Sequence, residues 1–207
     1  MMTQSFEELV ASMAAKTPTP GGGAAAAMAG CMGTSLFLMT VRFSQGKKAN
    51  VDREGDLAAA ESALSDHLEQ LRPMAERDCA AFDLVSAAFR MSKESDEQKV
   101  ARSAAIQESM VGAMLVPEET QKMILGVFVT MEAVRDCVGA SIASDLASGA
   151  ALLLAGAEGA YLNVRINAAE LKDRALADAT MARATAARDE IRGRQAAIAA
   201  QVDEMLS

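Results

Sequence analysis

Aromatic side chains, proline, histidine and cysteine are all scarce in this chain of 207 residues. Aromatics make up 3% of it, with no tryptophan and one tyrosine, so the core volume must come from aliphatic side chains and 14 methionines. Only 4 prolines interrupt a sequence rich in alanine, leucine and methionine, which are residues that favour helix. No stretch alternates apolar and polar residues for long enough to indicate a strand. The composition therefore predicts an all-α fold.

The scarcity of cysteine and histidine excludes most metal and disulfide frameworks. Cys31, Cys79 and Cys137 are scattered and odd in number, and they form no CxxC pair. Each lies in an apolar context, which indicates small buried side chains in a reducing cytoplasm. A zinc site from the single histidine, His67, and dispersed cysteines is not expected. We therefore expect no metal and no tightly bound cofactor.

Basic residues are fewer than acidic ones: the chain has 20 Lys and Arg and 28 Asp and Glu, which gives a net charge of −8 at pH 7. A nucleic-acid partner is not expected, since neutralising phosphates requires a basic face. Apolar residues make up 51% of the chain, which excludes a disordered protein. The length fits a single domain, residues 1–207, and we see no linker or repeat.

Residues 17–41 carry no charge, and they begin Thr-Pro-Thr-Pro-Gly-Gly-Gly. The stretch is long enough to cross a bilayer, but its Pro/Gly start and its small residues argue against a membrane span or a signal peptide. Proline fixes φ and glycine permits positive φ, so the loop can turn sharply and bring backbone N–H groups close to a ligand. The candidate binding residues in the loop are Thr19, Pro20, Gly21, Gly22 and Gly23. The alternative is a buried central helix that only packs tightly against its neighbours.

Apolar positions recur at helical spacing along the rest of the chain. They predict helices over residues 5–15, 24–44, 52–89, 95–116, 117–138, 144–170 and 172–206. Pro73 is expected to kink the third of these helices without ending it, and Pro117 to occupy the first turn of the fifth. A capping box, Ser95-x-x-Gln98, opens the fourth. The helices predict an antiparallel bundle, and their small-residue faces predict packing across a subunit boundary, most simply in a homodimer.

Two carboxylates lie where a charge is not expected. Asp78 points within about 40° of Phe82 at 100° per residue, on an otherwise apolar stripe. A carboxylate there is costly unless it is paired, hydrogen-bonded or in use, so Asp78 is either a catalytic candidate or the partner of an arginine. Asp145 is the only charge in residues 138–156. It is either a second catalytic candidate or, beside Ser144, the cap of the helix that it opens.

Two asparagines and three lysines are further candidates. Asn163 and Asn167 are four residues apart, hence on one helical face, in an otherwise mostly apolar segment. They either orient a polar ligand or satisfy each other across an interface. Lys47, Lys48 and Lys93 offer cations for an anionic ligand, although single lysines are usually just solvated.

Five motifs, in order, resemble those of the formiminotetrahydrofolate cyclodeaminase / methenyltetrahydrofolate cyclohydrolase family. They are Thr-Pro-Thr-Pro-Gly-Gly-Gly at 17–23, Gly46-Lys47-Lys48, Asp78-Cys79-Ala80-Ala81-Phe82, Ser144-Asp145, and Asn163-Val164-Arg165-Ile166-Asn167. The resemblance covers residues 5–173. It implies an all-helical homodimer with a folate cleft near the dimer interface, and chemistry at the one-carbon bridge between N5 and N10 of tetrahydrofolate.

Two reactions follow from the resemblance. The cyclohydrolase adds water to the methenyl cation and opens it to 10-formyltetrahydrofolate, whereas the cyclodeaminase closes a formimino group and releases ammonia. The chain has the length of the stand-alone cyclohydrolases, without a transferase domain, so we expect the first reaction, with a tetrahydrofolate derivative as substrate. Departures such as Ala24, where the family commonly has serine, keep open a folate-like binding protein without efficient catalysis, or a helical scaffold.

The resemblance also implies roles for the candidate residues. Asp78 becomes the base that stabilises the cation and takes a proton from water, and Asp145 its orienter or an alternative base. The glycine loop faces the pterin or a developing oxyanion. The substrate contacts outside the loop are expected from Lys47 and Lys48, which hold the glutamate tail, and from Phe82, Lys93, Ser144, Asn163 and Asn167.

Overall fold

The computed structural model describes residues 4–207, and these form seven α-helices and three short 3₁₀ segments, with no strand among them. The elements are α1 (Phe6–Ala14), α2 (Gly22–Ser44), η1 (Lys48–Arg53), α3 (Glu54–Leu71), α4 (Met74–Arg90), α5 (Asp96–Glu132), η2 (Arg135–Cys137), η3 (Ala140–Ile142), α6 (Ala143–Glu170) and α7 (Arg174–Leu206). The prediction of an all-α bundle is confirmed.

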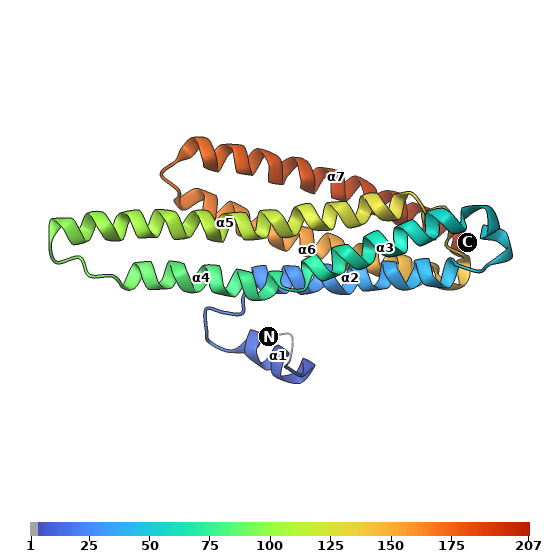
Figure 1. Ribbon diagram of the computed structural model, residues 1–207, viewed down its shortest axis with the longest axis horizontal. Coiled ribbons are helices and arrows are strands. Elements are labelled where there is room, and N and C mark those ends of the chain that lie inside the picture. Colours follow the sequence, from blue (N-terminus) through green and yellow to red (C-terminus); the bar gives the residue numbers. More distant parts are fainter. Residues whose placement is uncertain (1–3) are drawn as a thin grey trace.

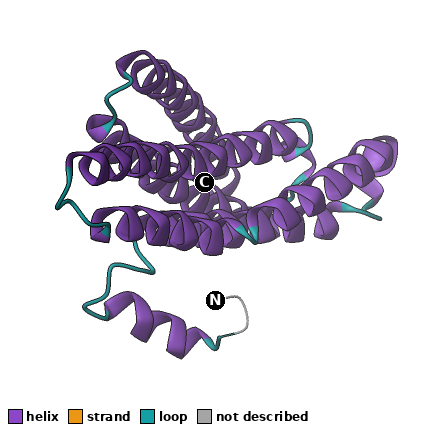
Figure 2. Cartoon of the chain, turned by 60° about the vertical axis from the view of Figure 1, so that its left-hand side comes forward, coloured by secondary structure: helices purple, strands orange, loops and turns teal. Residues whose placement is uncertain are grey.

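The long helices lie side by side along one axis, and α1 hangs from the body on its own loop (Figures 1 and 2). Helix α2 packs on α6, and α6 packs on α5 and α7. Aliphatic side chains fill most of the core, which contains few aromatic rings. The rings of Phe37 and Phe128 pack edge to face, with their centroids 5.8 Å apart. The three cysteines are free, with Cys137 buried and the other two half-buried.

Glycines set how closely α2 and α6 approach. A Cβ atom on Gly33 would lie 2.6 Å from Leu153 Cγ, and one on Gly156 would lie 2.8 Å from the Ala26 carbonyl oxygen. Both distances are shorter than side-chain contacts allow, so this pair of helices requires glycine at these two positions. The small residues of α2 therefore serve tight packing over much of the helix, which was the alternative interpretation of the sequence.

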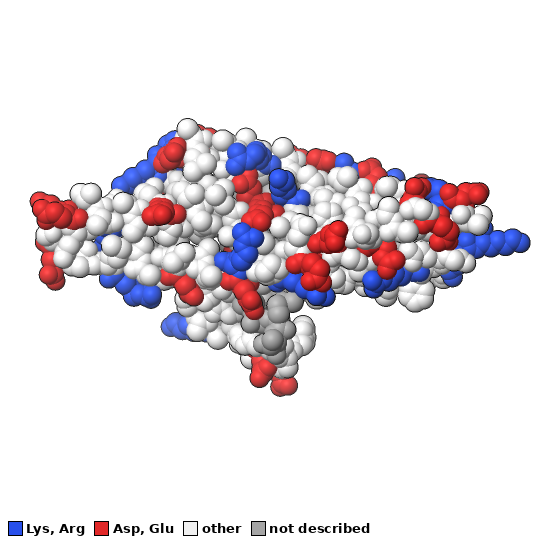
Figure 3. Space-filling model, in the orientation of Figure 1, with Lys and Arg blue, Asp and Glu red and all other residues white. Residues whose placement is uncertain are grey.

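Two helices, Gly22–Ser44 and the segment Ala140–Glu170, are long and apolar enough to cross a membrane by length and composition. Of the most apolar window, 56% is buried inside the bundle in the first and 39% in the second. Core helices of this kind pass the same test, so the finding is weak evidence for a membrane. On the face shown in Figure 3, acidic and basic side chains are scattered among uncharged ones.

Pro73 breaks the helix that the sequence predicted to run through it. Helix α3 ends at Leu71 and α4 begins at Met74, with Pro73 as the residue before it. The chain nevertheless continues in the same direction, so α3 and α4 lie end to end (Figure 1). The prediction of a kink was wrong, because the missing N–H and the ring of proline here end one helix rather than bend it.

Pro117 has the opposite effect to the one predicted. It lies buried inside α5, which begins at the expected Ser95 capping box and runs uninterrupted to Glu132. A proline lacks the N–H that would bond to the carbonyl four residues earlier, which here belongs to Ala113. The side-chain amide of Asn167 donates to that carbonyl at 2.9 Å. A hydrogen bond from α6 thus replaces the one that Pro117 removes, and the helix continues.

We predict that Pro117 and Asn167 are energetically coupled. Asn167→Ala leaves the Ala113 carbonyl without its partner and should lower the free energy of unfolding by about 1–3 kcal/mol. In a Pro117→Ala background the new N–H bonds to the same carbonyl, so Asn167→Ala should cost clearly less. Urea unfolding of the four proteins in this double-mutant cycle measures the coupling. An equal cost in both backgrounds would show that the carbonyl does not depend on Asn167.

Candidate active site

A cleft of about 660 Å³ opens where the glycine loop meets α4, α5 and α6. Its walls combine apolar side chains with a few polar and charged groups, as is usual for small-molecule sites. The lining residues are Pro18, Thr19, Gly21, Gly22, Gly23, Asp78, Phe82, Val85, Ser86, Phe89, Arg90, Met110, Ala113, Asn163, Ile166, Asn167 and Glu170. Three of the five predicted motifs therefore meet in one cleft.

The carboxylate of Asp78 lies at the N-terminus of α2. That helix begins after Gly21, which has no side chain to cap it, and the backbone N–H of Ala24 hydrogen-bonds to the Asp78 carboxylate instead. The first N–H groups of a helix have no partner within it and carry partial positive charge, so they favour an anion. Asp78, which lies on α4, therefore caps the N-terminus of α2.

Gly23 is the residue that allows this approach. A Cβ atom there would lie 2.1 Å from Asp78 Oδ1, closer than atoms can come, whereas a Cβ on Gly21 would keep an ordinary 3.4 Å from the Pro18 carbonyl oxygen. The triple glycine brings backbone close to a carboxylate of the same chain. The approach of this backbone to a ligand, which the sequence predicted, stays a prediction.

Burial dominates the electrostatics of Asp78. Burial raises the pKa of its carboxyl above the ordinary value of an aspartate, and the hydrogen bond from Ala24 opposes the rise without cancelling it. None of the ion pairs of the described residues includes Asp78. The alternative interpretation of the sequence, in which Asp78 pairs with an arginine, is therefore not supported. A half-buried carboxylate with a raised pKa in a cleft is a candidate general base.

The two predicted asparagines lie on the opposite wall. Their side-chain N–H groups are directed at backbone, from Asn163 to the Gly159 carbonyl at 2.8 Å and from Asn167 to Ala113 and Asn163 carbonyls at 2.9 Å. A Cβ atom on Gly22 would lie 3.3 Å from the side-chain amide nitrogen of Asn163. Holding the N–H groups in this way fixes the amide planes, so each side-chain oxygen has a set direction at the cleft wall.

Apolar side chains continue the cleft away from Asp78. Phe82, Val85 and Phe89 recur along the same face of α4, and the two rings are 39% and 49% exposed. Phe82 was predicted as a substrate contact and lines the cleft, and Val85 and Phe89, which the sequence did not predict as site residues, line it as well. Arg90 and Glu170 lie at the far end, and neither was predicted as a site residue. Arg90 directly follows the Asp78 stripe, which was the one available signal.

The other predicted residues lie elsewhere in the chain. Lys47 lines a separate pocket of about 250 Å³ beside Ser141 and Ile142, and Lys48 is exposed next to it. Ser144 and Asp145 begin α6 at that same end of the molecule (Figure 1). The length of α2, about 33 Å at 1.5 Å per residue, separates this end from the glycine loop.

Asp145 does not cap α6. The residue before the helix is Ile142, no side chain hydrogen-bonds to the first N–H groups, and Asp145 is the third residue of the helix. The capping interpretation was therefore wrong, and the carboxylate can favour the helix only through its dipole. Lys93 lies exposed in the loop between α4 and α5, outside the cleft lining. Pro20 is half-buried within the loop and does not line the cleft either.

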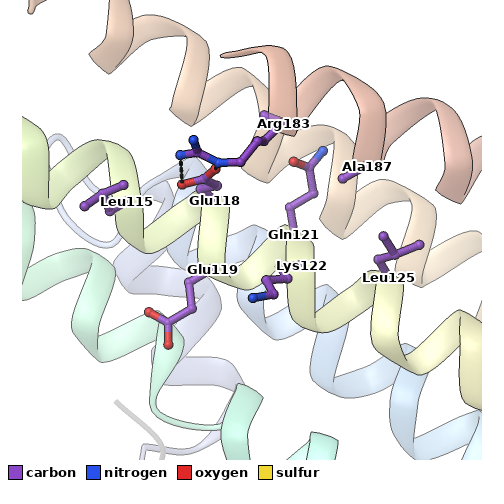
Figure 4. Close-up of a pocket in the computed structure, with 9 residues that line it drawn as sticks. Leu115, Glu118, Glu119, Gln121, Lys122, Leu125, Arg183 and Ala187 are labelled. Atoms are coloured by element: carbon purple, nitrogen blue, oxygen red, sulfur yellow. Dashed lines mark hydrogen bonds and ion pairs between the residues drawn. The ribbon is translucent and has the colours of Figure 1, made fainter. Parts of the chain in front are cut away.

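A third cavity, of about 420 Å³, lies between α5 and α7 (Figure 4). Both of its carboxylates are paired with arginines, Glu118 with Arg183 and Glu119 with Arg77, each at 2.6 Å. The buried Gln121 amide finds no hydrogen-bond partner within residues 4–207. Because neither carboxylate is free to accept a proton, this pocket is a weaker candidate for catalysis than the cleft at Asp78.

Known proteins resemble this chain in sequence along most of its length. Residues 5–186 match the family model described as formiminotransferase-cyclodeaminase. The chain is 35% identical over 175 residues to a methenyltetrahydrofolate cyclohydrolase of Methylorubrum extorquens, covering 84% of each protein. It is 25% identical over 173 residues to the formimidoyltransferase-cyclodeaminase of Rattus norvegicus, and spans 32% of that longer protein.

The fold agrees as well. The crystal structure of a formiminotetrahydrofolate cyclodeaminase from Thermotoga maritima superposes with a TM-score of 0.88 over 100% of this chain and 99% of that one, at 23% identity. The helical bundle is therefore shared along the whole chain. With the family model matching most of its length, this chain belongs to the formiminotransferase-cyclodeaminase family.

Proposed function

We propose that this protein hydrolyses 5,10-methenyltetrahydrofolate to 10-formyltetrahydrofolate. The observation that supports it most is the Asp78 carboxylate, half-buried at the N-terminus of α2 inside a cleft large enough for a folate. The relative named as a cyclohydrolase is 35% identical to this chain over 84% of both lengths, whereas the relatives named as cyclodeaminases that are compared above are 25% and 23% identical to it. Cyclohydrolase is therefore the first choice and cyclodeaminase the second.

The reaction needs one base and one attacking water. In the substrate, N5, the methenyl carbon and N10 share a positive charge, which the Asp78 carboxylate stabilises at short range. Asp78 accepts a proton as water bonds to the methenyl carbon, and a neutral tetrahedral adduct forms. The bond from carbon to N5 then breaks, N5 takes the proton from Asp78, and the hydroxyl loses its proton to solvent as the formyl C=O forms on N10. One water is consumed and one proton released.

The cleft provides the orientation that this chemistry requires. The fixed side-chain oxygens of Asn163 and Asn167 can accept hydrogen bonds from the N–H groups of the pterin ring. Phe82 offers an exposed ring at the cleft wall for stacking. No tightly bound cofactor enters the proposal, and the tetrahydrofolate derivative is the substrate.

Asp78→Asn should abolish most of the turnover, because an amide neither stabilises the cation as a charge does nor accepts the proton. We expect kcat to fall by about 10²–10⁴-fold, the usual contribution of a positioned base. The assay follows the loss of methenyltetrahydrofolate absorbance at mildly acidic pH, where spontaneous hydrolysis is slow. Full turnover by Asp78→Asn would remove Asp78 from the mechanism, and no acceleration by the wild type would favour a binding protein without catalysis.

A pair of glycine variants provides the matched control. Gly23→Ala forces the Asp78 carboxylate away from α2 and should lower kcat, whereas Gly21→Ala meets only an ordinary contact and should leave kcat closer to the wild-type value. Circular dichroism of both variants is the control for folding, and both should remain helical.

Stability should depend on pH through Asp78. Its pKa is raised in the folded state, so this group's contribution is fully present below the unfolded pKa, about 4, and is lost as pH rises through the folded pKa. Asp78→Asn should therefore be more stable than the wild type at pH 7, and the difference should shrink toward pH 4. Asp83→Asn, at an exposed position on the same helix, is the control. A difference that stays constant with pH would contradict the raised pKa.

The proposal includes a homodimer in the cytoplasm, formed through α2. Six of its residues recur at alternating spacings of four and three, as in the seam of a coiled coil, and each is partly or largely exposed: Ala25, Ala29, Met32, Leu36, Met39 and Phe43. Helix α1 faces the first part of this seam across an apolar space of about 520 Å³, which Ala25 and Met32 help to line. A second copy of the seam is its simplest partner.

Met39→Lys should convert the dimer to a monomer in sedimentation equilibrium, because it places a charge in the middle of the seam. Val129→Lys, at an exposed apolar position on α5, should leave the dimer intact. A wild-type protein that is monomeric at micromolar concentration would contradict this part of the proposal.

A further inference from the structure

The cleft contains three charged side chains, and only Asp78 is used by the proposed reaction. The other two, Arg90 and Glu170, also line it, and they are the last residues of α4 and α6. Arg90 is exposed and forms no hydrogen bond or ion pair with any residue in the range 4–207. It is therefore the one cation in the cleft wall that is free to bind an anion.

The spacing along α4 suits an elongated substrate. Asp78 and Arg90 are twelve residues apart on one helix, which is about 18 Å between their backbones. Side chains of a helix lean toward its N-terminus, so the Arg90 guanidinium can reach back toward Asp78 and shorten this distance. In a reduced folate, a benzoyl ring and an amide separate the one-carbon bridge from the carboxylates of the glutamate.

The wall between the two residues suits the middle of that substrate. Phe82, Val85 and Phe89 form an apolar track from Asp78 to Arg90, and the Phe rings are partly exposed. Arg102 fixes the end of the track, since its guanidinium lies 5.6 Å from the centre of the Phe89 ring and donates to the Phe89 carbonyl at 3.0 Å. A benzoyl ring can lie along this track while an anion reaches Arg90.

We propose that Arg90 binds the glutamate-tail carboxylate of a folate, and that Glu170 opposes that tail across the cleft. This inference rests on the proposed function for the identity of the substrate. It assigns the tail to the cleft itself, whereas the resemblance assigned it to Lys47 and Lys48, which lie at the other end of α2. A guanidinium is well suited to the role, because it binds a carboxylate through two parallel N–H donors.

Two substrates separate a tail contact from a general effect. One is 5,10-methenyltetrahydrofolate, and the other is its analogue with a methyl amide in place of the glutamate. Arg90→Ala should raise KM for the folate about tenfold or more and leave KM for the methyl amide nearly unchanged, with little change in kcat for either. Arg90→Lys should recover part of the loss. Lys99→Ala, which removes a surface cation paired with Asp96, is the control and should change neither.

Glu170 supplies a test of sign. If the two residues act through charge, Glu170→Gln should lower KM for the folate while Arg90→Ala raises it, and neither should affect the methyl amide. Parallel losses on both substrates would mean that the residues only support the fold, which would overturn the inference. A tail-specific loss in Lys47→Ala/Lys48→Ala, with none in Arg90→Ala, would overturn it as well.

Calorimetric binding of folic acid and of pteroyl methyl amide distinguishes failure of the function from failure of the inference. Wild-type protein that binds folic acid more tightly than the amide, with the difference lost in Arg90→Ala, supports the tail site even if turnover is absent. Wild-type protein that turns over the folate with equal KM values for both substrates keeps the function and rejects the site. Absence of both binding and turnover rejects both.

Discussion

The contact between the Asp78 carboxylate and the N-terminus of α2 is the constraint on which the rest of the site depends. A buried carboxylate is costly, and so is a helix N-terminus without a cap. Each group offsets part of the cost of the other, but burial still raises the pKa of Asp78. The arrangement therefore holds the carboxylate that we propose as the base in a fixed place, without fully stabilising its charge.

Most of the unusual sequence features near the cleft serve this contact or its surroundings. Gly23 has no Cβ because the carboxylate occupies that space, and Gly22 faces the amide of Asn163. Pro117 removes a backbone donor, and Asn167 replaces it from α6, which ties two walls of the cleft together. The amide nitrogen of Asn167 thus makes a structural hydrogen bond, and its side-chain oxygen is the atom that we propose for the ligand.

The sequence was informative where the signal was local. The helical periods predicted the all-α bundle, and the misplaced charge on the apolar stripe of α4 pointed to Asp78. Prolines were misjudged twice, because their effect depends on what lies beside them: Asn167 reaches the carbonyl freed by Pro117, and Pro73 separates α3 from α4. The lysine and Ser-Asp motifs lie at one end of the bundle, and the glycine loop lies at the other. The length of α2 separates the two ends, and the motifs themselves do not indicate this distance. Arg90 was missed because a single arginine at a helix end has no pattern.

Titration of the Asp78 carboxyl itself tests the account most directly. Carbon-13 NMR of protein with labelled aspartate, assigned with the Asp78→Asn variant, gives the pKa of this one group. We predict a value above that of an ordinary aspartate, about 3.9, and equal to the pH at which kcat/KM falls to half its maximum on the acidic side. A value at or below the ordinary one, or a titration unrelated to the activity, would contradict the claim that Asp78 is a buried base.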